Sequence, residues 1–562
     1  MKICVLSLLW PLQSLALHAS TFAGSTSTTV FPPPGITLTP NDPNFPPHPG
    51  GVPVAGEAEV IATAPHAPKV DSYSPLVEPR PLGGSGGAFD LLQHLGALSP
   101  FKSVDSFGLP DASESIPNGC KLKQVHLIHR HGARYPTTTS QGTPGAFATK
   151  LHAAASAGNL TVRAPLGFLK DWVYKLGRND LTPFGRQQMF DLGASFRIKY
   201  GELLDGFEEF PVFRTTTSGR MVDSALHFAA GFFGVQTFQQ DYHQLIIPES
   251  AGMNNTLAAG EVCPNANNDI AAFGILQSLK WANIYLQPTL KRLQKSIDGL
   301  ELDVFDLVAM QMACAYETVA LGFSAFCNAF TEEDWRGYAY LNDISVWYGS
   351  GMKEVDSPYI TEHYKRRLTG PGNPVVAALG VGYVQELVSR LTRTRITESS
   401  SSVNATLAGS EITFPFDQPI YVDATHDSGL SAIFTAMNFT SLAAQGPLPT
   451  DHIPDRQSFF VQKQVPFGAR LVGQVLSCKA ESKDTPSHIR WILNDGVLPL
   501  TGISGCTKSK DGLCELSAFV RGLQQRIAEI DFAFDCFANY TIPDPDTIVD
   551  GRFPPALRTS VP

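Results

Sequence analysis

The fold class is largely decided by two short apolar runs that lie far apart in the chain. Each run ends in a turn that carries a histidine. The run at 123–129 leads into Arg130-His131-Gly132-Ala133-Arg134-Tyr135-Pro136, and the run at 420–422 leads into Thr425-His426-Asp427. Strand–turn–helix units on either side of a mainly helical stretch predict an α/β fold with a mostly parallel sheet and a second, smaller helical domain. Because sites in such sheets lie at the carboxyl ends of strands, we expect the two motifs to meet.

Helix start signals add a third basic residue to this edge of the sheet. Thr182-Pro183 has the residue types of an N-cap and a first helical position, and residues 211–213 predict a short strand. Arg220 then lies in the first turn of the next helix, where backbone N–H groups attract anions. Ser218 is a suitable N-cap for that helix, whose buried stripe we expect at Val222, Ala225, Ala229 and Phe232.

Helical patterns dominate the middle of the chain. They include 302–321 and 375–391, and Thr331 followed by three acidic residues is typical of a capped helix start. We therefore expect an α/β domain in two parts, at residues 89–234 and 403–545. A mainly helical domain at 235–402 lies between them, and a C-terminal tail follows at 546–562.

Composition narrows the class of partner. Hydrophobic residues make up 43% of the chain and charged residues 17%, which is ordinary for a globular protein. The net charge of −10 leaves no broad basic face, so we expect no nucleic acid partner. Beyond the N-terminus no run of eighteen apolar residues occurs, and we expect no membrane partner.

The N-terminus and the cysteines indicate export. Residues 1–19 have the charged start, apolar run and small-residue exit of a signal peptide, and 20–88 are rich in Pro, Gly, Ser and Thr, as in a disordered or removed leader. Eight cysteines remain after the signal, and an even number favours disulfides, although spacing leaves the pairing open. Five glycosylation acceptors fit the same secreted, extracellular location: Asn159, Asn254, Asn404, Asn438 and Asn539.

The motif at 130–136 combines a nucleophile with phosphate ligands. The guanidiniums of Arg130 and Arg134 can grip phosphate oxygens, and the neutral imidazole of His131 between them can attack phosphorus. His426 and Arg220 would add positive charge to the same site. A protonated Asp427 would supply the proton that a departing alkoxide needs.

The ordered set of motifs resembles the histidine acid phosphatases, and is most similar to the fungal group that includes the phytases. The similarity runs from about residue 90 to 540 and includes, besides the two histidine motifs, the segments 180–185, 326–335, 380–383 and 519–523. It implies a phosphoglycerate-mutase-like sheet flanked by helices, and a secreted acid phosphatase that acts on phosphomonoesters through a phosphohistidine intermediate.

The resemblance also implies a role for each site residue. His131 would be the nucleophile and Asp427 the general acid, with no metal and no cofactor; the phosphoryl group would be bound by Arg130, Arg134, Arg220 and His426. The disulfides implied by the family pattern are Cys120 with Cys478, Cys263 with Cys536, Cys314 with Cys327, and Cys506 with Cys514.

The resemblance implies that the substrate is a small phosphorylated molecule, either a phosphomonoester or an inositol phosphate. In the phytases the segment after the motif carries a lysine cluster that suits a polyphosphorylated ring, whereas residues 138–145 here carry no cation. Because lost lysines weaken attraction to phytate more than to a monoester, we favour broad phosphomonoesterase activity, with phytase (myo-inositol hexakisphosphate hydrolase) as the alternative.

Three other classes fit less well. His126, His129 and His131 are close in sequence, but on a strand His126 points away, so we expect a packed His129 and no metal site. The segment 83–87 fits the serine-hydrolase pattern G-x-S-x-G without the strand and helix that this motif needs. A phosphate-ester binding protein without turnover would be expected to lack the nucleophile or the acid, and both are present. The apolar stretch 304–312 is interpreted as helix core.

Overall fold

The computed structural model describes residues 89–560, except 138–141, 271–272, 350–368 and 479–484. The predicted signal peptide and leader, the segment 83–87 and half of the lysine-free segment 138–145 lie outside the described residues.

An eight-stranded mixed sheet forms the centre of the protein, in the order β10-β8-β7-β1-β6-β3-β4 with β9 beside β8. Strands β1, β6, β3 and β4 are parallel neighbours, whereas β7, β8, β9 and β10 pair antiparallel. Their bounds are β1 Lys121–Arg130, β3 Val212–Thr216, β4 His243–Ile247, β6 Ile420–Thr425, β7 Arg470–Ser477, β8 His488–Leu493, β9 Gly496–Val497 and β10 Cys514–Glu515.

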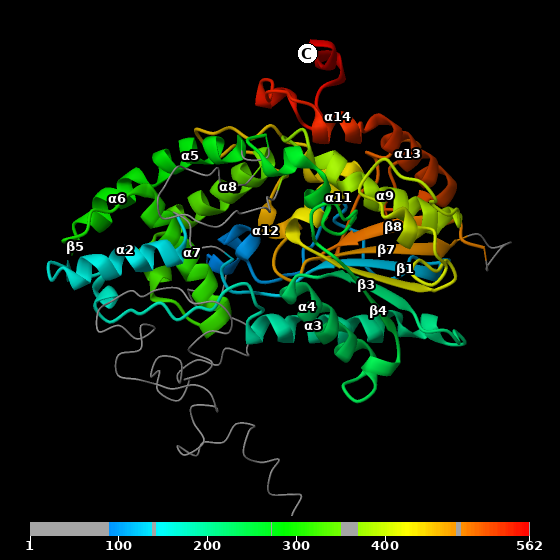
Figure 1. Ribbon diagram of the computed structural model, residues 1–562, viewed down its shortest axis with the longest axis horizontal. Coiled ribbons are helices and arrows are strands. Elements are labelled where there is room, and N and C mark those ends of the chain that lie inside the picture. Colours follow the sequence, from blue (N-terminus) through cyan, green and yellow to red (C-terminus); the bar gives the residue numbers. More distant parts are fainter. Residues whose placement is uncertain (1–88, 138–141, 271–272, 350–368, 479–484, 561–562) are drawn as a thin grey trace, which may run out of the picture.

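Helices cover both faces of this sheet (Figure 1). One face carries α3 (Pro183–Tyr200) and α4 (Gly219–Phe233), and the other carries α9 (Val376–Thr392), α11 (Asp427–Ala436) and α13 (Leu516–Glu529). The predicted α/β class is therefore confirmed. Shorter elements include the pair β2 (Thr161–Val162) and β5 (Ile297–Asp298), with α10 (Ala405–Ala408), α12 (Val461–Gln464) and α14 (Phe532–Phe537).

Two helix starts test the sequence signals. Thr182 caps α3 as predicted, because its hydroxyl accepts the N–H of Gly185 at 3.0 Å. Ser218 stands at the N-cap of α4, but its side chain makes no capping bond. The predicted stripe is also displaced: Val222 is half-buried, and the core positions are Met221, Ala225, Phe228, Ala229 and Phe232. The difference arises because α4 packs against α3 as well as the sheet.

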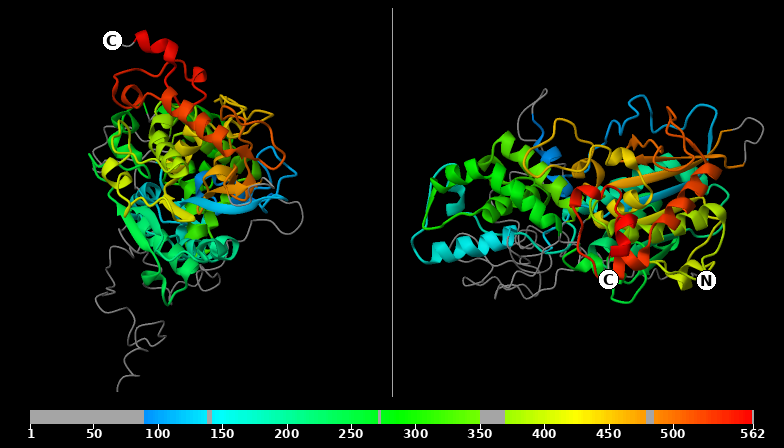
Figure 2. Two further views of the ribbon diagram at one scale, coloured as in Figure 1. Left: turned by 90° about the vertical axis from the view of Figure 1, so that its right-hand side faces the viewer. Right: turned by 90° about the horizontal axis from the view of Figure 1, so that it is seen from above.

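A second group of helices extends from one end of the sheet (Figures 1 and 2). It consists of α2 (Pro144–Ser156), α5 (Phe273–Tyr285), α6 (Gln287–Gln294), α7 (Val304–Leu321) and α8 (Glu332–Tyr348). Thr331 and Asp334 form a capping box at the start of α8, as predicted. The division into domains stays a prediction, and β4, within 235–402, pairs with β3 of the sheet.

Helix α7 is the one helix among the described residues that is long and apolar enough to cross a membrane. Of its apolar window, 78% is buried inside the protein, as in a core helix. This agrees with the interpretation of residues 304–312 as core.

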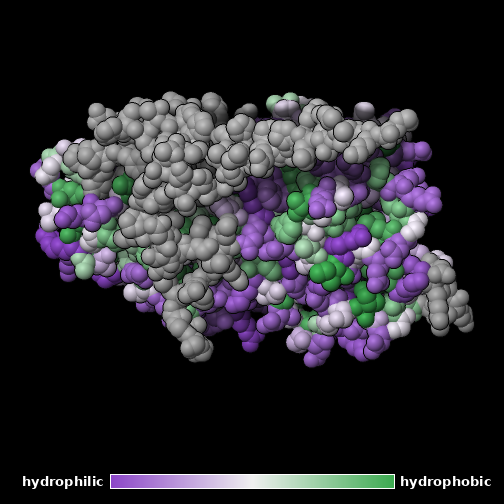
Figure 3. Space-filling model, turned by 90° about the horizontal axis from the view of Figure 1, so that it is seen from below, coloured by the Kyte–Doolittle hydropathy of each residue, from purple (hydrophilic) through white to green (hydrophobic). Residues whose placement is uncertain are grey.

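Alternation along β1 separates the two layers of the core. Val125 and Leu127 point toward α3 and α4, where they join Phe196, Phe213 and Phe228. His126 points to the opposite face and stacks on Tyr421, with ring centroids 4.7 Å apart. Seen from the α3 and α4 side, the surface mixes hydrophilic and hydrophobic residues (Figure 3). Ile198 of α3 is 85% exposed.

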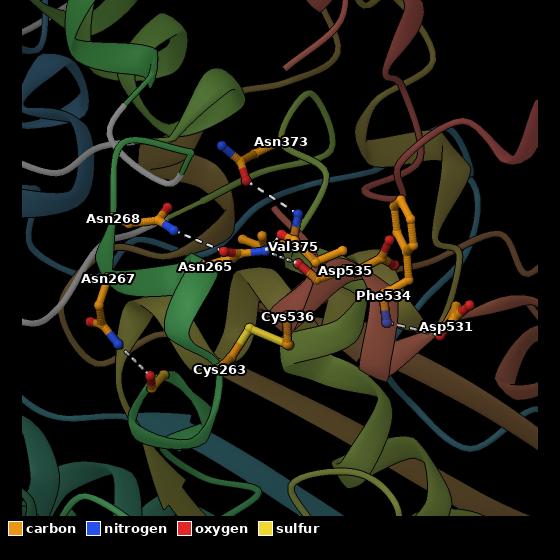
Figure 4. The surroundings of a disulfide bond; sticks show 12 residues. Cys263, Asn265, Asn267, Asn268, Asn373, Val375, Asp531, Phe534, Asp535 and Cys536 are labelled. Carbon is orange, nitrogen blue, oxygen red and sulfur yellow. Dashed lines mark hydrogen bonds between the residues drawn. A yellow bond between two sulfur atoms is a disulfide. The ribbon is translucent and has the colours of Figure 1, made fainter. Parts of the chain in front are cut away.

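The structure contains the four disulfides that the resemblance implies: Cys120–Cys478, Cys263–Cys536, Cys314–Cys327 and Cys506–Cys514. The first joins the start of β1 to the end of the neighbouring β7. The second joins α14 to the segment before Asn265, whose side-chain amide donates to the carbonyls of Asp535 and Ala538 at 3.0 Å each (Figure 4).

Candidate active site

The carboxyl ends of three neighbouring strands carry the residues predicted from the two motifs. Arg130, the last residue of β1, is the parallel partner of Thr425 in β6. His131 and His426 follow these partners directly, and their ring centroids lie 5.7 Å apart. Arg220 is the second residue of α4, which follows β3. Parallel register therefore brings together side chains that are hundreds of residues apart in the chain.

Arg130 is held rigidly at this edge. Its guanidinium donates to the carbonyl oxygens of Ala97 and Val465, the latter at 2.7 Å, and to Asp427 Oδ2 at 2.7 Å. The guanidinium carbon lies 4.6 Å from the ring centre of Phe467, in cation–π geometry. Since the side chain is fully buried, these contacts fix its direction.

Arg134 approaches from the turn after β1. Its Nη1 donates to the carbonyl of Tyr135 at 3.0 Å and to the hydroxyl of Tyr316, on α7, at 3.1 Å. Its guanidinium carbon is 6.0 Å from the centre of the same Phe467 ring that contacts Arg130. The two arginines of the motif thus lie on one aromatic support.

His131 is buried and uncharged. Its Nδ1 lies 2.8 Å from the carbonyl oxygen of Gly132, which can only accept, so Nδ1 carries the proton and Nε2 presents a lone pair. Burial, followed by the charges of Arg130, Arg220 and Arg134, holds the pKa of His131 well below its ordinary range. The imidazole is therefore neutral at mildly acidic pH, as a nitrogen nucleophile must be.

His426 lies between a carboxylate and a guanidinium. Its Nε2 is 2.8 Å from Glu249 Oε1, and its Nδ1 is 3.5 Å from Arg220 Nη2. Both side chains of the His426–Glu249 pair are almost completely buried, at 4% and 3% exposure. Because a carboxylate only accepts hydrogen bonds, the proton of His426 lies on Nε2.

Asp427 begins helix α11 and forms an ion pair with Arg130. Burial alone would raise its pKa, but the charges of Arg130, Arg134 and Arg220 outweigh burial and leave the pKa below its ordinary value. With no phosphate bound, this carboxyl is therefore ionised at mildly acidic pH.

Other residues singled out in the sequence serve the structure. Arg214 pairs with Asp423 and Glu386 inside the sheet, at 2.6 and 2.9 Å, which separates it from the phosphate-binding candidate Arg220. His129 stacks on Phe228 with centroids 5.3 Å apart, as expected for a packed histidine. Among the described residues no group of three His, Cys, Asp or Glu side chains is arranged to hold a metal ion.

Sequence reasoning missed several residues of the site. Phe467 and Tyr316 carry no local signal, because an aromatic residue in a loop or a core helix is common in any protein. Glu249 carries one: it follows the apolar pair Ile246-Ile247, two residues after strand β4 ends. A polar residue just beyond a strand of a parallel sheet is a site candidate, but this strand lay within the segment predicted to be helical.

The site as a whole can bind and transfer a phosphoryl group. Three guanidiniums and a histidine surround one uncharged ring nitrogen, with a carboxyl on the adjoining helix. This donor set suits anions, and bulk water has little access to His131, which is 1% exposed.

Comparison with known proteins identifies the family. A sequence model described as the histidine phosphatase superfamily (branch 2) matches residues 121–494. Phytase A of Aspergillus fumigatus is 31% identical over 441 residues, which cover 76% of this chain and 87% of the relative. Phytase A of Arthroderma benhamiae is 30% identical over 456 residues, covering 80% and 92%.

Solved structures agree with this match. The phytase from D. castellii superimposes with a TM-score of 0.62 at 25% identity, over 82% of this chain and 90% of that one. A multiple inositol polyphosphate phosphatase of Bifidobacterium longum, in complex with inositol hexasulfate, shares the fold with a TM-score of 0.51 at 13% identity, over 76% and 96%. The chain belongs to branch 2 of the histidine phosphatase superfamily and is a phosphoric monoester hydrolase.

Proposed function

We propose that His131 Nε2 attacks the phosphorus of a phosphomonoester and becomes phosphorylated. The observation that carries this proposal is the tautomer of His131: Nδ1–H is committed to the carbonyl of Gly132, so the free lone pair is on Nε2, among the three guanidiniums. Arg130, Arg134, Arg220 and His426 bind the phosphoryl oxygens. Removing one such donor from a preorganised site typically slows an enzyme about 10²- to 10³-fold.

The reaction has two balanced steps. In the first, the N–P bond forms, the bond from phosphorus to the ester oxygen breaks, and Asp427 gives its proton to the departing alkoxide. In the second, Asp427 accepts a proton from water, the resulting hydroxide attacks phosphorus, and the P–N bond breaks. Inorganic phosphate leaves and His131 returns to its neutral state.

The proton that the first step needs enters with the substrate. Asp427 is ionised in the free protein, but a phosphomonoester holds its second proton below about pH 6. Binding of the phosphoryl group offsets the guanidiniums and raises the pKa of Asp427, so the proton can pass to this carboxyl. Activity accordingly falls as the pH rises above about 6, where the substrate arrives without this proton.

Inositol phosphates are the second candidate substrate class. Relatives named phytase, at 30–31% identity over most of this chain, favour them. The lack of cations after the motif, within residues 142–145 of the described part, favours simple monoesters. We infer a broad phosphomonoesterase that accepts phytate more slowly than its phytase relatives do.

Four disulfides among the described residues support a secreted, extracellular location for this enzyme. Disulfides of this number form and persist in oxidising compartments. The glycosylation acceptors of the sequence fit the same proposal.

The test compares p-nitrophenyl phosphate with phytate across mildly acidic pH, using the purified full chain and the variant His131→Ala. We expect the variant to lose turnover of both substrates while still binding inorganic phosphate. Retained turnover in His131→Ala would contradict the assignment. Phosphate binding without turnover in the unaltered protein would instead favour the binding-protein alternative.

A further inference from the structure

A carboxylate that the reaction scheme does not use lies next to the site. Glu249 Oε1 accepts the Nε2–H of His426 at 2.8 Å, on the side of the ring away from Arg220. The Glu249 side chain is only 3% exposed. Burying a carboxylate is unfavourable unless charge and hydrogen bonds compensate, so this arrangement requires an explanation.

Several contacts fix Glu249 in place. The hydroxyl of Thr216, the last residue of β3, donates to the same Oε1, and the backbone N–H of Glu249 donates to Thr217 Oγ1 at 3.0 Å. The buried side chain of Asn255 donates to the carbonyls of Ile247 and Pro248 at 3.3 and 3.1 Å. Two neighbouring strands and a buried amide thus hold the carboxylate against the ring.

The direction of the imidazole follows from this contact. With Nε2–H committed to Glu249, the atom of His426 that faces Arg220 and the phosphate position is Nδ1. A neutral ring offers only a lone pair there, which accepts the N–H of Arg220 Nη2 at 3.5 Å but repels a phosphoryl oxygen. A protonated ring offers an N–H donor and a positive charge.

We propose that Glu249 is a positioning residue that holds His426 in this orientation and stabilises its imidazolium form, so that Nδ1–H donates to the bound phosphoryl group. The proposal rests on the phosphatase function proposed above and assigns a further residue to it. Glu249 would orient His426 by accepting the ring N–H that points away from the phosphate. Removing a carboxylate in such a position commonly lowers the affinity or activity of a site about 10- to 100-fold.

The charges around His426 decide when it is protonated. Arg220 on α4, and Arg130 and Arg134 after β1, oppose the imidazolium. Glu249 after β4, Asp427 on α11 and the bound phosphoryl group favour it. The neutral His131 faces the ring without adding charge, and Glu261 lines a cavity of about 40 Å³ beside His426. Removing the charge of Glu249 therefore lowers the pH to which the imidazolium persists.

The test measures kcat, KM and the inhibition constant of inorganic phosphate for Glu249→Gln between mildly acidic and neutral pH. We expect kcat/KM to fall about 10- to 100-fold and phosphate inhibition to weaken. In the unaltered protein the substrate's second proton sets the alkaline limb of kcat/KM at about pH 6. In Glu249→Gln we expect this limb to move to lower pH, because the imidazolium of His426 is then lost before the substrate's proton. A purely structural role would lower activity at every pH and leave this limb where it is.

Two further variants test whether the effect of Glu249 comes from its contact with the His426 ring or from any negative charge near the site. Glu261→Gln removes a charge of the same sign from the wall of the cavity beside His426. This charge also favours the imidazolium, but it acts from the cavity wall and not through the ring N–H, so the limb is expected to move much less than in Glu249→Gln. His426→Ala removes the ring that Glu249 positions. Adding Glu249→Gln to this variant should therefore cause little further loss of kcat/KM. Where Glu249→Gln does not fold, Glu249→Asp, which keeps the charge but withdraws the carboxylate from the ring by one methylene, should move the limb in the same direction by a smaller amount.

The outcomes distinguish this proposal from the function on which it rests. An unshifted limb in Glu249→Gln, or full additivity with His426→Ala, would overturn the role of Glu249 while His131→Ala remained inactive. Retained turnover in His131→Ala would instead overturn the phosphohistidine mechanism.

Discussion

Gly132 is the position where one added methyl group should disable the site. A Cβ at this residue would lie 2.7 Å from the carbonyl carbon of Gly185 in the first turn of α3, and closer still to its oxygen. Ordinary carbon–carbon contact begins at about 3.5 Å, so the motif and α3 must separate by about 0.8 Å or more. The clash cannot be relieved by turning a side chain, because both contacting segments are backbone. They are also joined to each other: the backbone N–H of Thr182 donates to the carbonyl of Ala133 at 2.9 Å.

The expected cost of Gly132→Ala is therefore both catalytic and structural. A displacement approaching 1 Å at a nucleophile reduces the rate about 100-fold, and overpacking destabilises a fold by about 1–3 kcal/mol. The assays are kcat with p-nitrophenyl phosphate and urea unfolding. Gly167→Ala is the matched control, since a Cβ there meets nothing within 4 Å. A Gly132→Ala variant with unaltered kcat and stability would refute the reasoning.

Three further outcomes are expected. Asp427→Asn should slow alkyl phosphates about 10²-fold or more and activated aryl phosphates much less, and equal slowing would remove Asp427 from the role of acid. Burial lowers the pKa of His126 to about 3, so this histidine stays neutral in the folded protein while the unfolded chain protonates it near pH 6.5. The free energy of unfolding is therefore unaffected by His126 above pH 6.5 and decreases as the pH falls toward 3. Between pH 7 and 4 the free energy of unfolding, measured with urea, should decrease by on the order of 3 kcal/mol less in His126→Phe than in the unaltered protein. Identical pH dependence in the two proteins would contradict this. Finally, Asn159 and Asn539 are exposed, whereas the side-chain amide of Asn438 is bonded to a backbone carbonyl. Glycopeptide mass spectrometry should find glycans on the first two and little on Asn438, and full occupancy of Asn438 would show that this bond is absent in the mature protein.

Most residues of the site could be predicted from the sequence, because the same local pattern occurs at both histidine motifs. An apolar strand followed by a histidine turn occurs at both motifs, and parallel pairing of β1 with β6 converts this repetition into proximity. Arg220 was placed by the helix that starts at 219, and it lies where that start predicts. These inferences needed only strand ends and helix starts, which short windows of sequence define well.

The contacts that complete the site depend on tertiary packing. Phe467 supports two arginines from a loop after α12, and Tyr316 reaches Arg134 from the middle of a core helix. Neither position is distinguished by its neighbours in sequence. The ionised state of Asp427 was also unexpected, because its pKa depends on three guanidiniums whose distances no sequence pattern provides.

The most direct test of the mechanism is the position of the phosphoryl group during turnover. The Asp427→Asn variant is mixed rapidly with p-nitrophenyl phosphate, quenched in alkali, where phosphohistidine survives, and mapped by peptide mass spectrometry. The account predicts one acid-labile phosphoryl group, on His131, that appears in the burst phase and is absent from His131→Ala. A phosphoryl group on another residue, or turnover by a protein that never carries one, would contradict it.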